Sequence, residues 1–275
     1  MKTNPTSTRS NNSLGLLLAM ASLVLVACGG AHGPSADQVR ESMEEYRTQA
    51  GEAGYQALHR SEPMPEQRDV WHEGHASIDI SFIAPDTGAA HPLILYLPGL
   101  GEDVDAGGQW REAWARAGYA VLCIQPINEI KALSHLSENE DRDPRWIGHR
   151  HFSEVSLERR QTAIQSALEG LKKRTQTPGS IYSKVDLDHI VVAGYDLGAQ
   201  TTAALAGEKL RTPLPALKSF NITAALIFSP HVDLAAGNLA GRFKPVGLPF
   251  MAITGTEDSD PYGMSSPSLR RELWK

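Results

Sequence analysis

The segment from Val191 to Gln200 carries the clearest chemical signal in this 275-residue chain. Its letters VVAGYDLGAQ place Asp196 between Gly194 and Gly198, after an apolar run and before a helix-like stretch. Two glycines around one reactive side chain are typical of a sharp strand-to-helix turn that lifts the side chain to the edge of a sheet. The helix N-terminus at that point favours negative charge. The pattern therefore predicts a carboxylate at the floor of a cleft, where it can act as a nucleophile.

The elements that must position this carboxylate are apolar strand-like runs that alternate with amphipathic helix-like stretches. We expect strands over 76–84, 93–97, 119–124, 190–193, 224–228 and 249–254. We expect helices over 35–50, 109–117, 156–173 and 199–210, and a long loop or insertion over 128–153. This alternation predicts a mostly parallel sheet covered on both faces, with ligands bound at the carboxyl ends of its strands. We find no internal repeat and no second domain.

In this context the G-x-D-x-G segment resembles the nucleophile elbow of the α/β-hydrolase superfamily. The chain is most similar to the compact bacterial branch that includes dienelactone hydrolase-like and platelet-activating-factor acetylhydrolase-like esterases, and the resemblance covers about residues 70–275. The other matching segments are Leu97-Pro-Gly-Leu-Gly101 at the oxyanion turn, Ala117-Gly-Tyr-Ala-Val-Leu122 before a strand, and Ile253-Thr-Gly-Thr-Glu-Asp258 at the acid loop. The resemblance implies an α/β-hydrolase fold with a mostly parallel sheet and helices on both faces.

The resemblance also implies a role for each site residue. Asp196 takes the position of the nucleophile, and Asp258 that of the acid that orients the base, with Asp260 as second choice. The main-chain N–H groups of Leu100 and Leu197 would form the oxyanion hole. We expect a small-molecule substrate, no cofactor and no metal.

An aspartate at the nucleophile position departs from the serine or cysteine of most relatives. Epoxide hydrolases and haloalkane dehalogenases use aspartate there, and the carboxylate attacks an sp³ carbon to form an alkyl ester that water hydrolyses. They usually carry tryptophan where this chain has Leu197, and His-Gly-x-Pro where it begins with Pro98. An ordinary ester would give an anhydride, so serine-type esterase chemistry is not expected. Two substrate classes stay open, ester-like and alkyl, and Asp196 can also be read as a helix cap in a non-catalytic relative.

The family's base is a histidine that follows the last strand, but the last histidine here is His231, ahead of Asp258. We expect a C-terminally truncated chain that lacks the final strand and helix and is inactive as printed; a natural enzyme without that strand is the alternative. His231 can be a pocket-lining residue or a substitute base. Two functions therefore stay open: a hydrolase whose base comes from beyond Lys275, and a non-catalytic lipoprotein that binds a ligand or partner in the same cleft.

The N-terminus predicts export. The apolar run from Leu14 to Ala27 is shorter than the about 20 residues that span a bilayer, and suits a signal-peptide core. Leu25-Val-Ala-Cys28 resembles a bacterial lipobox, which implies a lipid on Cys28, and Gly29 after it favours the periplasmic side of the outer membrane. We therefore divide the chain into a signal peptide at 1–27, a lipidated tether and helix at 28–70, and an incomplete α/β-hydrolase domain at 71–275.

Composition excludes some functions. A net charge of −6 and a pI near 5.9 argue against nucleic-acid binding, which needs a basic surface. The ten histidines show no metal-ligand spacing, and we expect the neighbouring His149 and His151 to be solvated in a polar loop. With Cys28 lipidated, Cys123 has no disulfide partner and is expected to be a small buried hydrophobe.

Overall fold

The computed structural model describes residues 60–130 except 75, then 144–214, 217, 220–232 and 238–274, with four residues nearer the N-terminus. The chain divides into two compact units, 1–56 and 57–275. Within the first, Glu41, Glu44, Glu45 and Thr48 are described, and all four are helical and exposed. The rest of the helix predicted over 35–50, the predicted signal peptide and Cys28 lie outside the described residues.

The second unit is built on a seven-stranded sheet in the order β1-β2-β4-β3-β5-β6-β7. The strands are β1 (Gln67–Glu73), β2 (Ala76–Ile83), β3 (His91–Leu97), β4 (Ala120–Pro126), β5 (Val185–Tyr195), β6 (Ile222–Phe228) and β7 (Phe250–Ile253). β2 runs antiparallel to both β1 and β4, and the remaining pairs are parallel. This order, with helices on both faces, is that of an α/β-hydrolase fold, and the predicted fold class is confirmed.

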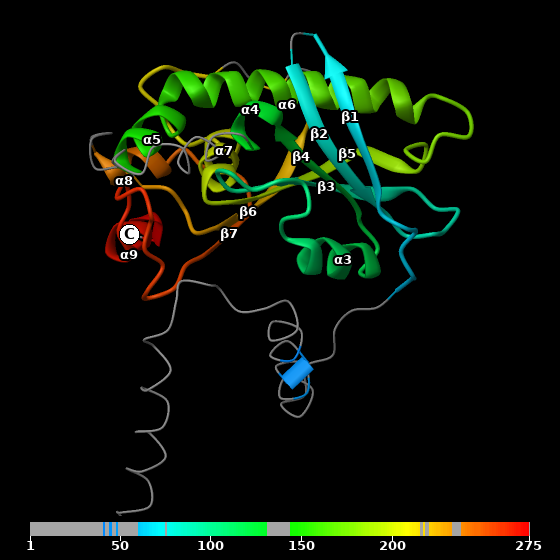
Figure 1. Ribbon diagram of the computed structural model, residues 1–275, viewed down its shortest axis with the longest axis horizontal. Coiled ribbons are helices and arrows are strands. Elements are labelled where there is room, and N and C mark those ends of the chain that lie inside the picture. Colours follow the sequence, from blue (N-terminus) through cyan, green and yellow to red (C-terminus); the bar gives the residue numbers. More distant parts are fainter. Residues whose placement is uncertain are drawn as a thin grey trace, which may run out of the picture. The chain divides into compact units, whose positions relative to one another are not determined.

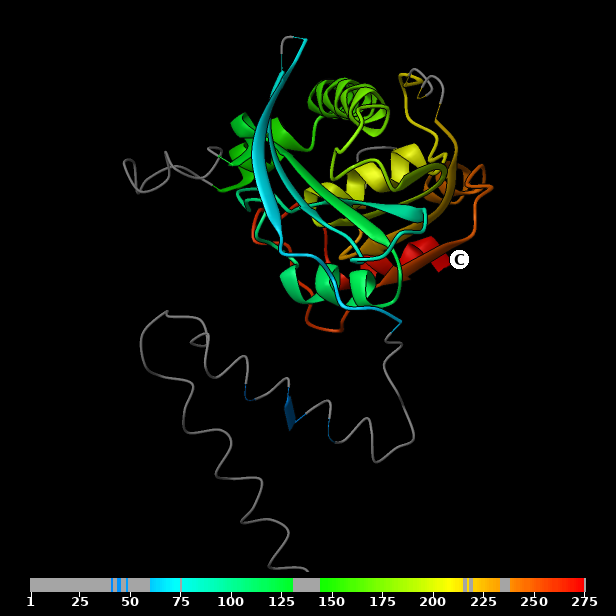
Figure 2. The same ribbon diagram turned by 90° about the vertical axis from the view of Figure 1, so that its right-hand side faces the viewer.

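The helices are α3 (Gly108–Arg116), α4 (Ile127–Ile130), α5 (Pro144–His151), α6 (Glu154–Thr175), α7 (Leu197–Leu205), α8 (Leu239–Phe243) and α9 (Pro267–Arg270), followed by the 3-10 turn η3 (Arg271–Trp274). The long α6 lies along one face of the sheet and α3 against the other (Figures 1 and 2). α6 turns Leu157, Ile164, Leu168 and Leu171 inward at helical spacing, which explains its predicted position.

The structure departs from the predicted elements in three places. β1 was not predicted, because its letters QRDVWHE bury only Trp71 and give an edge strand no apolar pattern. α7 ends at Leu205 and not at 210, because Gly207 adopts a φ of 111° that breaks the helix. The segment predicted as a long loop or an insertion over 128–153 contains most of α4 and all of α5 within its described part, which excludes the loop.

Two apolar clusters pack against the sheet from opposite sides. The larger joins the inner face of α6 to strands β2, β3, β4 and β5, and the smaller joins α3 to residues such as Val121 and Cys123. Cys123 is fully buried, as expected of a small hydrophobe. Over the described ranges, no helix is both long and apolar enough to cross a membrane.

Candidate active site

The turn between β5 and α7 is as tight as its sequence predicts. Asp196 has a φ of 51° and a ψ of −106°, a conformation that residues with a side chain rarely adopt. A Cβ atom on Gly194 would lie 2.2 Å from the carbonyl oxygen of Gly198, and one on Gly198 would lie 1.9 Å from that of Leu97. Both glycines are therefore required for β3, β5 and α7 to meet, and this contact strains the backbone at Asp196.

The carboxylate of Asp196 faces the two amides predicted to bind an anion. The N–H of Leu100 donates a hydrogen bond to Oδ2 of Asp196 at 3.2 Å, and the N–H of Leu197 also stabilises the charged form. The side chain makes no helix-capping hydrogen bond, which argues against the cap interpretation. Gly198 N–H bonds to Pro98 O at 3.1 Å and ties the two turns together.

Burial raises the pKa of Asp196 from 3.8 to about 6. The amides of Leu100 and Leu197 and the cation of Arg270 act in the opposite direction, whereas the negative charge of Asp260 adds to the rise. The carboxyl is thus poised near neutrality, a property of groups at functional sites.

Asp258, the predicted acid, lies next to a cation. Its Oδ2 accepts a hydrogen bond from Thr254 Oγ1 at 2.7 Å and lies 3.6 Å from Nε of Arg270. The guanidinium of Arg270 is almost fully buried, and its Nη1 donates to the carbonyl of Pro230. In the described part of the chain, Asp258 therefore orients an arginine and no histidine.

Asp260, the second choice, holds its own loop. Its two carboxylate oxygens accept hydrogen bonds from three main-chain N–H groups, at distances between 2.6 and 2.9 Å; the donors are Tyr262, Met264 and Ser265. This bonding fixes the turn that follows β7. The negative charge of Asp260 contributes to the raised pKa of Asp196.

His231 is packed against an aromatic ring. Its ring stacks on Phe152, with 4.3 Å between centroids, and it is 5% exposed. Burial, together with the neighbouring cations of Arg242, Arg270 and Arg160, lowers the pKa of His231 from 6.5 to about 3. A neutral, stacked ring of this kind matches a buried packing residue better than a base.

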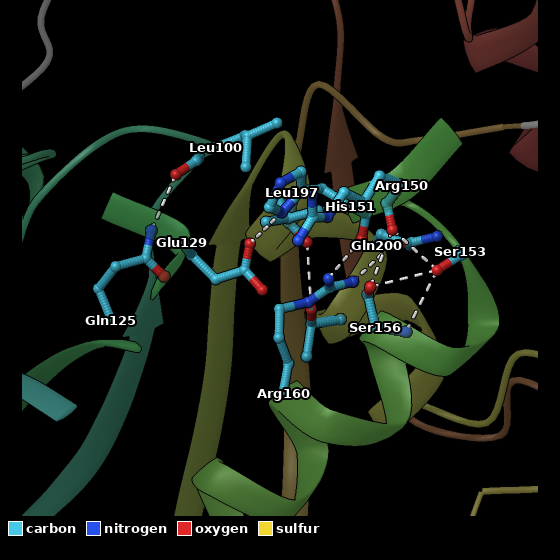
Figure 3. A network of polar contacts seen from close by, with 12 residues as sticks. Leu100, Gln125, Glu129, Arg150, His151, Ser153, Ser156, Arg160, Leu197 and Gln200 are labelled. Atoms are coloured by element: carbon cyan, nitrogen blue, oxygen red, sulfur yellow. Dashed lines mark hydrogen bonds and ion pairs between the residues drawn. The ribbon is translucent and has the colours of Figure 1, made fainter. Parts of the chain in front are cut away.

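A polar network beside the elbow was missed from the sequence (Figure 3). His151, expected to be solvated, places Nδ1 2.6 Å from Oε2 of Glu129. Arg160 donates three hydrogen bonds, to Thr201 Oγ1 at 3.0 Å, to the carbonyl of His151 at 2.7 Å and to Gln200 Oε1 at 2.6 Å. The available signal was Arg160 itself, a charged residue within the apolar stripe of α6.

Apolar and aromatic groups surround the turn. The side chains of Leu100 and Leu197 pack in one cluster with Ile147, Phe152 and Tyr262. Tyr195 and Tyr262 lie close enough to Asp196 for its charge to raise their pKa values further, although burial is the main cause of both shifts. Among the residues with described side chains, no group of three histidine, cysteine or acidic residues is placed to bind a metal ion.

Comparison with known proteins adds the following. No protein-family model matches the sequence, and no curated protein is similar to it by sequence. Among solved structures, a protein of Klebsiella pneumoniae described as a putative dienelactone hydrolase is 11% identical, with a TM-score of 0.49 over 77% of this chain and 79% of its own. A dienelactone hydrolase-like promiscuous phosphotriesterase from metagenomic libraries is 14% identical, with a TM-score of 0.45 over 78% and 76%.

A ferulic acid esterase from Streptomyces cinnamoneus is also 14% identical, with a TM-score of 0.43 over 77% of this chain and 68% of its own. At these identities and TM-scores the similarities assign no role to any residue. The fold assignment rests on the strand order, and the site on the geometry at Asp196.

Proposed function

We propose that the chain is a hydrolase in which the carboxylate of Asp196 attacks an electrophilic sp³ carbon of a small molecule, such as an epoxide or an alkyl halide. The observation that carries this proposal is the hydrogen bond from the Leu100 amide to Oδ2 of Asp196 on a strained turn. It fixes one carboxylate oxygen in the anion hole and leaves Oδ1 as the attacking atom.

The reaction proceeds in two steps. Oδ1 forms a bond to the carbon as the carbon–halogen or carbon–oxygen bond breaks, which gives an alkyl ester of Asp196. Water then adds to the ester carbonyl, and the negative charge that develops on Oδ2 is stabilised by the N–H groups of Leu100 and Leu197. Collapse of this intermediate releases the alcohol and restores the carboxylate.

An epoxide also needs a proton for its leaving oxygen. Tyr195 and Tyr262 lie close enough to Asp196 to be affected by its charge, and a phenol carries its proton at neutral pH, so either one can supply this proton. This environment favours an epoxide over a halide. An ordinary ester is disfavoured, because attack by Asp196 would give an anhydride.

The proposal is tested with a panel of styrene oxide, 1-chlorobutane and p-nitrophenyl acetate. Wild-type protein should convert at least one sp³ electrophile, and Asp196→Asn should convert none. Asp196→Ser should gain activity on p-nitrophenyl acetate, because the same anion hole suits an acyl-serine intermediate. Failure of the wild type on every sp³ compound would contradict the proposal.

A second candidate, a non-catalytic binding protein, is favoured by one observation. His231 stacks on Phe152 and makes no described hydrogen bond to Asp196, so it supplies no base there. This candidate predicts that the cleft binds a ligand without turnover and that Asp196→Ser gains no esterase activity.

We also propose that the chain is a lipoprotein anchored through Cys28 to the periplasmic side of the outer membrane. The support is the lipobox-like sequence Leu25-Val-Ala-Cys28 followed by Gly29. Cells expressing the full chain should incorporate tritiated palmitate into it, and Cys28→Ser should abolish the label and the recovery in outer-membrane fractions. Labelling that persists in Cys28→Ser would contradict this anchor.

A further inference from the structure

Glu129 and His151 form a buried carboxylate–imidazole pair that the reaction above does not use. Oε2 of Glu129 lies 2.6 Å from Nδ1 of His151, and the side chains are 3% and 14% exposed. An ionised carboxylate only accepts hydrogen bonds, so the hydrogen lies on Nδ1 and a neutral ring presents its lone pair at Nε2. No described residue is hydrogen bonded to Nε2. This is the tautomer that a general base requires.

Two main-chain segments form the anion hole, one at Leu100 and one at Leu197. Glu129 attaches the pair to the first of them. The N–H of Gly101 donates a hydrogen bond at 3.3 Å to the main-chain oxygen of Glu129. Gly101 directly follows Leu100, whose N–H binds Asp196. The main chain of Glu129 is thus attached to the same turn that binds the nucleophile.

The segment at Leu197 is attached to the pair through His151. The next residue, Phe152, packs against the side chains of Leu100 and Leu197, which flank the carboxylate of Asp196. Arg160 bonds to both the carbonyl of His151 and the hydroxyl of Thr201 on α7. Figure 3 labels His151, Arg160 and Leu197 in this network. Both main-chain segments of the anion hole therefore contact the segment that carries His151.

We propose that His151, oriented by Glu129, is the base that activates the hydrolytic water; this inference rests on the proposed function. Nε2 of His151 takes one proton from the water as its oxygen bonds to the ester carbonyl of Asp196. The intermediate carries its negative charge on Oδ2, and its collapse breaks the bond between the acyl carbon and the alkyl oxygen. Protonated His151 returns its proton to that leaving oxygen, so the alcohol departs and the Asp196 carboxyl is regenerated.

This assignment places the base on the segment between β4 and α6. It accounts for a site in which His231 is stacked on Phe152 and Asp258 is paired with Arg270. It also explains why the carboxylate of Glu129 is buried beside the ring, because a carboxylate there stabilises the imidazolium formed during the reaction.

The two steps can be separated with full-length protein, styrene oxide and mass spectrometry of the intact chain. His151→Gln should form the ester on Asp196 as the wild type does, but release it about 100-fold more slowly or worse, because that is the usual contribution of a general base. The ester should therefore accumulate in this variant. His149→Gln is the matched control, since His149 is exposed on the same helix and should leave both steps unchanged.

Glu129→Gln keeps the shape of the pair and removes its charge, so release should fall about tenfold or more. Its pH–rate profile for release should also change, which a purely structural role would not produce. It serves as the test if His151→Gln does not fold, as judged by thermal unfolding. Release at the wild-type rate in folded His151→Gln or Glu129→Gln would overturn the role of His151 and leave the proposed function standing. If the wild type gives neither product nor adduct with any sp³ compound, the proposed function fails, and this inference with it.

Discussion

Replacing Asp196 by asparagine should make the protein more stable at neutral pH, because the native fold raises the pKa of this carboxyl. The pKa rises from 3.8 to about 6, mainly through burial. A group with a raised folded-state pKa destabilises the native state once the pH exceeds its unfolded pKa. At about 1.4 kcal/mol per pKa unit the full cost is about 3 kcal/mol, of which about 2 kcal/mol develops between pH 4 and pH 8.

Urea denaturation of wild type and Asp196→Asn at pH 4 and pH 8 measures this cost. The free energy of unfolding of the wild type should fall by about 2 kcal/mol more than that of the variant between the two pH values. Asp186→Asn is the control, because a hydrogen bond from His189 lowers the pKa of Asp186 instead of raising it. The free energy of unfolding of this variant should therefore fall between the two pH values as that of the wild type does. Parallel pH dependences of wild type and Asp196→Asn would refute the burial of a charged Asp196.

Three further results are expected. The rate of ester formation on Asp196 should rise with pH through about 6, since only the carboxylate attacks; a rate independent of pH between 4 and 8 would count against this. Gly198→Ala should destabilise the fold by about 3 kcal/mol or more, because its Cβ would lie 1.9 Å from a carbonyl oxygen. Gly88→Ala is the control, because a Cβ there would meet nothing within 4 Å. Equal melting temperatures of the two variants would refute the tight turn. Arg160→Met should cost about 3 kcal/mol in chemical denaturation, because it removes the donor from two buried hydrogen bonds and one part-buried one. Arg159→Met, at an exposed position, should cost little.

The fold was predictable where the signal is local. Buried strands such as β3 and β4 contain runs of five apolar residues, so their letters identify them in one sequence. The glycines around Asp196 likewise mark the turn, because each one lacks room for a Cβ atom. β1 carries no such signal, since an edge strand with one buried side chain can be built from polar residues.

The site was predictable only in part, for the same reason. Asp196, Leu100 and Leu197 lie on two turns with local signatures, and the structure brings them together. The pair Glu129–His151 forms because α5 folds back against the elbow, which no periodicity in the intervening residues indicates. The partner of Asp258 is also a tertiary feature, because Arg270 reaches it from α9.

The most direct test of a carboxylate nucleophile is the fate of its oxygen atoms. Wild-type protein should turn over styrene oxide in water enriched in oxygen-18, and the peptide that contains residue 196 should then be analysed by mass spectrometry. Because water attacks the acyl carbon of the ester, heavy oxygen should accumulate in the Asp196 carboxyl over repeated turnovers. Turnover that labels only the product diol, with Asp196 unlabelled, would show that water attacks the substrate directly and would contradict the account.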